Sequence, residues 1–105
     1  MDSKYKVRVS AAAKDDLDEI FTYFAEKLYT EKSADKLMAE FQRMTLSLDE
    51  NPQRFSYSLD PVLAQKGYRR ALVRKYVILF LIDEETKTVS VMRVFHGSMD
   101  YARYI

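Results

Sequence analysis

The 105-residue sequence contains no cysteine, only two glycines and two prolines, and a single histidine. Without cysteine the chain can form no disulfide and has no thiolate to act as a nucleophile or a metal ligand. A metal site built on the one histidine, His96, would need carboxylate partners that the nearby sequence hardly supplies. We therefore predict no metal and no cofactor. The scarcity of glycine and proline argues against a disordered chain.

Long hydrophobic runs are also missing. The first six residues, MDSKYK, are charged and polar, and no apolar segment of a signal peptide follows them. The apolar run at residues 76–82, YVILFLI, is far too short to cross a bilayer as a helix. We therefore expect a single cytoplasmic domain over residues 1–105, with no membrane partner.

Charge is balanced overall and uneven along the chain. The net charge is +1, but residues 1–60 hold 9 basic and 12 acidic side chains, whereas residues 61–105 hold 8 and 4. This asymmetry predicts an anionic partner for the C-terminal part. The total charge is much lower than that of a typical nucleic-acid-binding protein.

The C-terminal half has the pattern of three consecutive strands. Residues 76–82 are apolar at every position, which is typical of a strand covered on both faces. Residues 67–73 and 88–96 flank this run and alternate in character, and the charged segment 83–87 suits a hairpin loop. A fourth strand is predicted at residues 4–10, where Tyr5, Val7 and Val9 alternate with basic residues. We expect all four strands to be antiparallel.

Two amphipathic helices are predicted between the first strand and the other three. The first begins after the cap residue Ser10, and its apolar stripe contains Leu17, Ile20, Phe21, Phe24 and Leu28. The second begins near Thr30, ends at Asn51-Pro52, and has a stripe of Ala34, Leu37, Met38, Phe41, Thr45 and Leu48. Their short connection predicts an antiparallel hairpin that lies on the sheet.

The segment between the second helix and the next strand contains both prolines and has no clear periodicity. We predict that residues 51–66 form a long loop, which Phe55, Tyr57 and Leu59 attach to the core. If the helical hairpin covers one face of the central strand, the other face needs its own cover. We expect the C-terminal tail or another chain to supply it.

Several short motifs follow one another in a fixed order along this pattern. They are a helical hairpin closed by Asn51-Pro52, then Gly67-Tyr68-Arg69-Arg70, Tyr76-Val77-Ile78, and Arg93-Val94-Phe95-His96-Gly97 followed by Asp100-Tyr101. Over essentially its whole length the chain resembles the RelE/ParE superfamily of bacterial toxins. The resemblance implies an α+β fold of the order strand–helix–helix–strand–strand–strand, with an antiparallel four-stranded sheet packed against an N-terminal helical hairpin. It also implies the toxin of a type II toxin–antitoxin, or plasmid stabilisation, module, bound by a cognate antitoxin.

The RelE branch of that superfamily cuts messenger RNA on the ribosome without a metal. Such cleavage needs a base, a cation for the phosphorane charge and an acid for the leaving oxygen. Where those members have two alternating lysines and a Tyr-Arg pair, this chain has Arg69 and Ala71, then Tyr76 and Val77. In addition, Ser98-Met99 stands where members of both the RelE and the ParE branch usually have arginines. The candidate ribonuclease residues that the resemblance leaves are Arg69, Arg70, Arg93, His96 and Tyr101. Strand alternation sends Arg69 and Arg70 to opposite faces, and we favour Arg70 with Arg93, His96 and Tyr101.

The ParE branch, which poisons DNA gyrase by binding and needs no catalytic group, is more similar to this chain in its Tyr-Arg-Arg, Tyr-Val-Ile and Arg-Val-Phe-His-Gly motifs. A ParE-like gyrase inhibitor is therefore the leading hypothesis. Its alternatives are a RelE-like ribosome-dependent endoribonuclease and a degenerate, non-toxic member that still binds antitoxin. Whether the chain is an enzyme stays open at this point.

The densest group of cationic and aromatic residues is the candidate binding surface, made of Tyr68, Arg69, Arg74 and Lys75. The alternative for these cations is a solvated strand edge that deters aggregation. The alternative for His96 is an imidazole at a strand end that is hydrogen-bonded to backbone.

Overall fold

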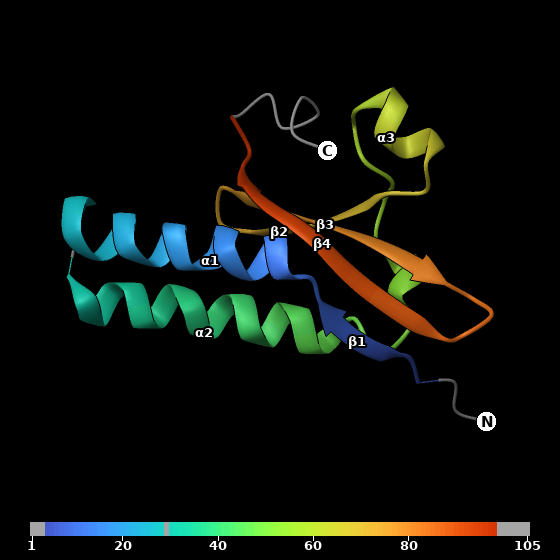
Figure 1. Ribbon diagram of the computed structural model, residues 1–105, viewed down its shortest axis with the longest axis horizontal. Coiled ribbons are helices and arrows are strands. Elements are labelled where there is room, and N and C mark those ends of the chain that lie inside the picture. Colours follow the sequence, from blue (N-terminus) through green and yellow to red (C-terminus); the bar gives the residue numbers. More distant parts are fainter. Residues whose placement is uncertain (1–3, 29, 99–105) are drawn as a thin grey trace.

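The computed structural model describes residues 4–28 and 30–98 of the chain, which form four strands and three α-helices (Figure 1). The elements in chain order are β1 Lys6–Val9, α1 Ala11–Tyr23, a π-helical turn Phe24–Leu28, α2 Glu31–Ser47, a 3₁₀ turn Pro52–Arg54, α3 Pro61–Gln65, β2 Arg69–Val73, β3 Tyr76–Asp83 and β4 Thr88–His96. The predicted strands and the helical hairpin are confirmed, because α1 and α2 lie side by side along one face of the sheet (Figure 1).

The sheet has the order β1-β4-β3-β2 and is mixed. β2 and β3 pair antiparallel, as do β3 and β4, but β1 pairs parallel to β4, with Val7 opposite Val89. The expectation of an entirely antiparallel sheet was wrong for this pair. Alternation shows which side chains share a face, but it does not give the direction of pairing between strands that are distant in sequence.

Side-chain caps begin both long helices at the predicted residues. The hydroxyl of Ser10 accepts the Ala13 N–H at 3.0 Å, and that of Thr30 accepts the Ser33 N–H at 3.1 Å. α2 ends at Ser47, before the predicted Asn51-Pro52 boundary, and Asn51 then adopts a left-handed conformation with φ of 47°. The π-helical turn after α1 has no counterpart in the sequence prediction, because the apolar spacing continues through it.

The helical face of the sheet carries the larger core. Ile78 and Phe80 of β3 pack there with the helix residues of the predicted stripes. Of those stripe residues, Phe24, Ala34, Leu37, Phe41 and Leu48 are buried, whereas Leu17, Ile20, Phe21 and Met38 are half-buried against the same core. Burial of each large apolar side chain contributes about 1.5 to 3 kcal/mol, so this face dominates the hydrophobic stabilisation of the fold.

The opposite face of the sheet is covered by α3, and we call it the α3 face. Its core contains Leu63, Tyr68, Val77, Leu79 and Phe95. Part of the expected external cover therefore comes from residues 51–66 themselves, while the expected role of the tail beyond Ser98 lies outside the described residues.

The prediction of one long loop at residues 51–66 was wrong. A carboxylate oxygen of Asp60 accepts the N–H groups of Val62 and Leu63, and Pro61 occupies the first helical turn, so a short helix forms. Phe55 reaches the core and meets Phe80 edge-on at 5.8 Å.

The other two residues expected to attach residues 51–66 to the core do not reach it. Tyr57 and Leu59 are 51% and 76% exposed. None of the described helices is both long and apolar enough to span a membrane.

Candidate functional site

An irregularity in β4 shapes the region around the predicted site residues. Leu79 pairs with Arg93 and Phe80 pairs with Val91, so Met92 is an extra residue, or bulge, in β4. At this point β1 ends, and Ser10 donates its N–H to Val91 O and its hydroxyl to Met92 O. Beyond the bulge, the outer edge of β4 therefore faces helix α1 instead of a strand.

Asp16 of α1 occupies this edge. Its carboxylate accepts two hydrogen bonds from the Arg93 guanidinium, at 2.8 and 2.9 Å, and a third from the Val94 N–H at 2.9 Å. The hydrogen bond that Arg93 donates to the Asp16 carboxylate raises the pKa of Arg93 above its usual range. Both side chains are mostly shielded from solvent, with exposures of 24% for Arg93 and 11% for Asp16.

Strand register decides which predicted residues share a face. Arg70 and Arg93 both pair with Leu79, so the three side chains form a row across the α3 face. This matches the predicted choice of Arg70 with Arg93, and their role remains a prediction. Arg70 donates from Nε to the Tyr57 carbonyl oxygen at 3.2 Å.

Arg69 lies on the helical face, opposite Phe80. Its guanidinium donates to the carbonyl oxygen of Phe55 at 2.6 Å and lies 4.0 Å from the ring centroid of Tyr57. These contacts attach residues 53–57 to β2, which is a structural role. Tyr68 is 8% exposed within the core of the α3 face, so its ring is not presented at the surface as the predicted binding group required.

His96 lies on the helical face, on the opposite side of the sheet from Arg70. It pairs with Tyr76, whose ring meets Phe41 edge-on at 5.6 Å and the His96 ring at 5.4 Å. The His96 Nδ1 accepts the Ser98 N–H at 3.1 Å, which matches the expected hydrogen bond to backbone. Because Nδ1 is an acceptor, the neutral ring carries its proton on Nε2. Tyr101, the last predicted catalytic residue, lies outside the described residues.

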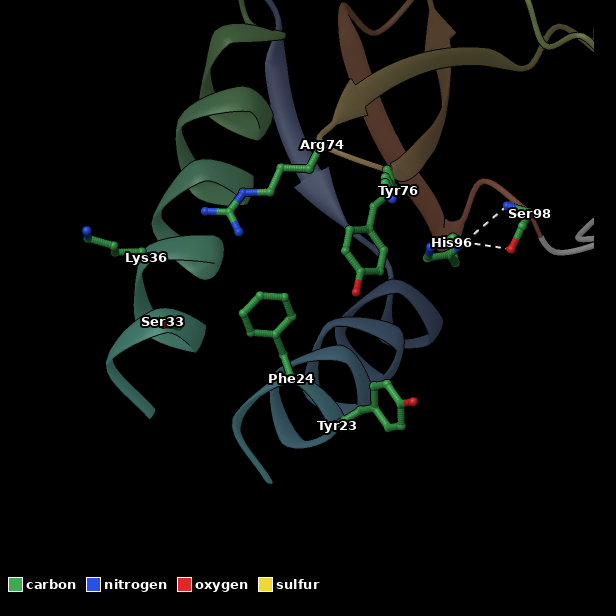
Figure 2. Close-up of a pocket in the computed structure, with 9 residues that line it drawn as sticks. Tyr23, Phe24, Ser33, Lys36, Arg74, Tyr76, His96 and Ser98 are labelled. Carbon is green, nitrogen blue, oxygen red and sulfur yellow. Dashed lines mark hydrogen bonds between the residues drawn. The ribbon is translucent and has the colours of Figure 1, made fainter. Parts of the chain in front are cut away.

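A hollow of about 740 Å³ opens where the helical hairpin meets the end of the sheet (Figure 2). We call it the tip hollow, and its walls include Tyr23, Phe24, Ser33, Lys36, Lys75, Tyr76 and His96. Figure 2 shows the Tyr76 ring pointing from the sheet into the hollow, with Phe24 and Tyr23 on the helical side opposite. A second hollow of about 560 Å³ shares Tyr23, Tyr76 and His96 and also contains Asp16 and Arg93.

The turn between β2 and β3 forms one wall of the tip hollow. Arg74 adopts φ of 53° there, and its guanidinium donates two hydrogen bonds to Glu40 of α2, at 2.7 and 3.0 Å. The hydrogen bond from Arg74 lowers the pKa of Glu40. The Gly97 N–H donates to Lys75 O at 2.8 Å, and a Cβ on Gly97 would lie 3.1 Å from that oxygen, so the absence of a side chain permits this approach.

Sequence reasoning missed the residues that α1 and α2 bring to this region, namely Asp16, Tyr23, Ser33 and Lys36. Tyr23 and Lys36 lie between apolar stripe residues, and Asp16 and Ser33 directly precede the two stripes. A polar or aromatic side chain at such positions normally means solvent exposure. The predicted antiparallel hairpin could have indicated that some of these residues meet, because it places the end of the first helix beside the start of the second. Within residues 4–28 and 30–98, no group of three His, Asp or Glu side chains is arranged to hold a metal ion.

Comparison with known proteins identifies the class of protein, the type II toxins of the RelE/ParE superfamily. Residues 7–101 match the ParE toxin family of the type II toxin–antitoxin system parDE. Since the match spans most of the sequence, the chain belongs to this family, and the resemblance stated from its motifs is confirmed. No curated protein sequence matches the chain.

Solved structures agree with this assignment. The chain is similar to a protein of the chromosomal ParDE system from P. aeruginosa, with a TM-score of 0.72, 15% identity, and coverage of 90% of this chain and 98% of that one. It is also similar to a chain of the RelBE2 toxin–antitoxin complex from Mycobacterium tuberculosis, with a TM-score of 0.65, 28% identity, and coverage of 89% and 98%. An archaeal RelE–RelB complex from Pyrococcus horikoshii OT3 gives a TM-score of 0.57, 12% identity, and coverage of 90% and 97%. At 15% and 12% identity the first and third similarities concern the fold alone.

Proposed function

We propose that this toxin inhibits DNA gyrase by binding it, and that a cognate antitoxin neutralises it in the cytoplasm. Membership of the ParE family supports the gyrase target, because poisoning by binding is the activity that the ParE resemblance implies. Binding requires a complementary surface and no catalytic constellation, so this proposal is compatible with the absence of the lysine and arginine pattern of the ribonucleases.

The observation that carries this proposal is the separation of Arg70 from His96, together with the pairing of Arg93 with Asp16. Arg70 lies on the α3 face and His96 on the helical face opposite Tyr76; of the described candidates, only Arg93 lines a hollow together with His96. In addition, the Asp16 carboxylate accepts two hydrogen bonds from the Arg93 guanidinium. The positive charge of Arg93, which would have to stabilise a phosphorane, is therefore already balanced. A base, a cation and an acid must surround one phosphate for cleavage, and the described candidates do not converge in this way.

A RelE-like endoribonuclease is the second candidate, and one observation favours it. Arg70 of β2 and Arg93 of β4 both pair with Leu79 of β3, so two cations lie in one row on the same face of the sheet. The 28% identity to a chain of a RelBE complex is compatible with it. This reading requires Asp16 to release Arg93 when RNA binds.

The antitoxin is proposed to cover apolar side chains around α3 and β2. Leu59, Val62 and Leu72 are 76%, 59% and 52% exposed, which is high for large apolar residues; the first two belong to the segment around α3 and the third to the edge strand β2. The three structural relatives named above come from ParDE and RelBE toxin–antitoxin systems. Exposed apolar surface that an antitoxin covers would make the isolated toxin more prone to association than its complex.

Two parallel assays test the target. Purified protein is added to DNA gyrase with supercoiled and relaxed plasmid, and separately to a translation extract with a defined message. Inhibited supercoiling with trapped cleavage complexes supports the gyrase proposal. Codon-phased cuts in ribosome-bound message, without effect on gyrase, would replace it with the ribonuclease reading. Activity in neither assay, with antitoxin binding retained, would identify a degenerate member.

The antitoxin surface is tested with matched serine variants. The partner is sought as the product of a short neighbouring reading frame, and its affinity is measured by calorimetry. Leu72→Ser should weaken binding by about tenfold, since a central apolar contact is typically worth more than 1 kcal/mol. Leu46→Ser, which changes a 61% exposed leucine on α2, is the control. Equal affinities for both variants would show that the antitoxin binds elsewhere.

A further inference from the structure

The charged residues that the structure describes in the wall of the tip hollow are all basic. Lys36, Arg74 and Lys75 line the hollow, and none of the described lining residues is a carboxylate. Glu40 neutralises Arg74 through the two hydrogen bonds described above, but it lies outside the lining. Among the described residues, neither Lys36 nor Lys75 forms a salt bridge. Two ammonium groups on flexible stems therefore border a concave surface whose described lining contains no acidic side chain.

The neutral groups of the hollow are hydrogen-bond donors and aromatic rings. The Tyr76 ring is fixed by edge-on contacts with Phe41 and His96, and it points into the hollow (Figure 2). His96 can donate only through Nε2, because Nδ1 accepts from Ser98. Tyr23 is 55% exposed at the boundary with the second hollow, where its ring is available for stacking.

We propose that the tip hollow binds a nucleotide, with its phosphate at Lys36 and Lys75 and its base against Tyr23. A volume of about 740 Å³ is within the usual range of about 300 to 1,000 Å³ for small-molecule sites. Cations beside an exposed aromatic ring suit a ligand that joins a phosphate to a planar base. An acidic peptide would satisfy the two lysines but would leave the Tyr23 ring without a stacking partner.

The same chemistry occurs in a free nucleotide and at the end of a nucleic-acid strand. Lys36, Lys75 and Tyr23 are not among the ribonuclease candidates, although the candidate His96 also lines the hollow, and no cleavage step is implied. The inference goes beyond the gyrase proposal, because it concerns a ligand that the toxin itself binds. The binding experiment contains no gyrase, so a negative result would leave the gyrase proposal unchanged.

The test is a titration of the intact protein followed by NMR and calorimetry. The probes are thymidine 5′-monophosphate, thymidine, an octamer of deoxythymidine with and without a 5′-phosphate, and an acidic octapeptide. Thymidine 5′-monophosphate should bind at least about tenfold more tightly than thymidine, because charge-assisted hydrogen bonds hold the phosphate. Tighter binding of the phosphorylated octamer than of the mononucleotide would assign the site to a strand end; equal affinity would assign it to a free nucleotide.

Two pairs of variants locate the binding. Lys36→Gln with Lys75→Gln should weaken binding of the monophosphate by about tenfold or more. Lys14→Gln with Lys66→Gln removes the same net charge from exposed lysines that do not line the hollow, and it should leave the affinity unchanged. Glu40→Gln removes a carboxylate beside the hollow and should strengthen binding, which is the opposite direction.

Three results would overturn the proposal. Equal affinity for thymidine and its monophosphate would exclude a phosphate site. Equal weakening by the two lysine pairs would show that only the overall charge matters. Tighter binding of the acidic peptide than of every nucleotide probe would assign the hollow to a protein partner.

Discussion

The two faces of the sheet are covered by very different amounts of structure. Helices of 13 and 17 residues cover the helical face, whereas a helix of 5 residues covers the α3 face. Both faces contain strand residues with no exposure, Phe80 on the first and Leu79 on the second. Around α3, however, Leu59 and Val62 remain more than half exposed, as does Leu72 of the edge strand β2. We infer that the helical face supplies most of the stability and that the α3 face retains surface for partners.

The largest effect is expected on the helical face. Phe41, which is 2% exposed and contacts Tyr76, packs between α2 and the sheet. Phe41→Ala should lower the free energy of unfolding by about 3 to 5 kcal/mol, because the cavity cannot collapse between two packed layers. Urea denaturation followed by circular dichroism measures this loss. An unfolding midpoint close to the wild-type value would contradict the assignment of the main core to this face.

A smaller loss is expected from the equivalent truncation on the other face. Leu63 of α3 is also 2% exposed, but it belongs to a short helix flanked by surface. Leu63→Ala should cost about 2 to 3 kcal/mol, at the low end for buried leucine, since α3 can shift to fill the space. The same denaturation experiment gives the comparison. A loss larger than that of Phe41→Ala would reverse the proposed ranking of the two faces.

The pair between Asp16 and Arg93 joins α1 to the edge of β4. Asp16→Asn keeps the size of the side chain but removes its charge and one of the two acceptor oxygens that the Arg93 guanidinium and the Val94 N–H share. We expect a loss of about 1 to 3 kcal/mol, typical of charged hydrogen bonds that are mostly shielded from solvent. The control is Asp18→Asn, an exposed position on the same helix. If both variants unfold at the same denaturant concentration, the edge contact contributes nothing.

The smallest effect concerns the loop end of the sheet and appears only in acid. Tyr5 donates to one carboxylate oxygen of Glu84 and Gln53 donates to the other, each at 2.7 Å, and the hydrogen bond from Tyr5 is the main reason that the pKa of Glu84 is lowered. A carboxyl with a lowered folded-state pKa stabilises the fold above its unfolded pKa of about 4.3, and this stabilisation is lost as pH falls through the lower folded value.

Glu84→Gln should therefore flatten the decline in stability between neutral and acidic pH. Thermal unfolding at a series of pH values measures the slope. Glu85→Gln, which alters the next residue of the same exposed loop, serves as the comparison. The explanation fails if wild type and Glu84→Gln decline with the same slope.

Local sequence patterns were sufficient to predict much of the fold. The alternation of Val89 and Val91, the run at residues 76–82 and the caps Ser10 and Thr30 each depend on near neighbours, and all were readable from the sequence. The parallel pairing of β1 with β4 depends on the path of the intervening chain. α3 was missed because its single turn lacks a measurable helical period, although Asp60-Pro61 is a recognisable helix start.

The candidate site was less predictable than the fold. Alternation correctly separated Arg69 from Arg70, and register then aligned Arg70 with Arg93. No local pattern, however, indicated that Asp16 would pair with Arg93 from the opposite end of the chain, or that Tyr23 and Lys36 would meet the β2–β3 turn. Such contacts depend on tertiary packing between elements that are distant in sequence.

The pairing of β1 with β4 also constrains the order of folding. Arg8 and Ser90 are hydrogen-bonded although they are 82 positions apart, so the first strand has no partner until nearly the whole chain has been synthesised. The helical hairpin contains mostly local contacts and should become protected first, because closing a long loop costs entropy before it gains contacts. Pulse-labelled hydrogen exchange during refolding would detect this order, and simultaneous protection of the β1 and α2 amides would refute it. A nascent toxin would then remain without its completed sheet until its last strand had left the ribosome.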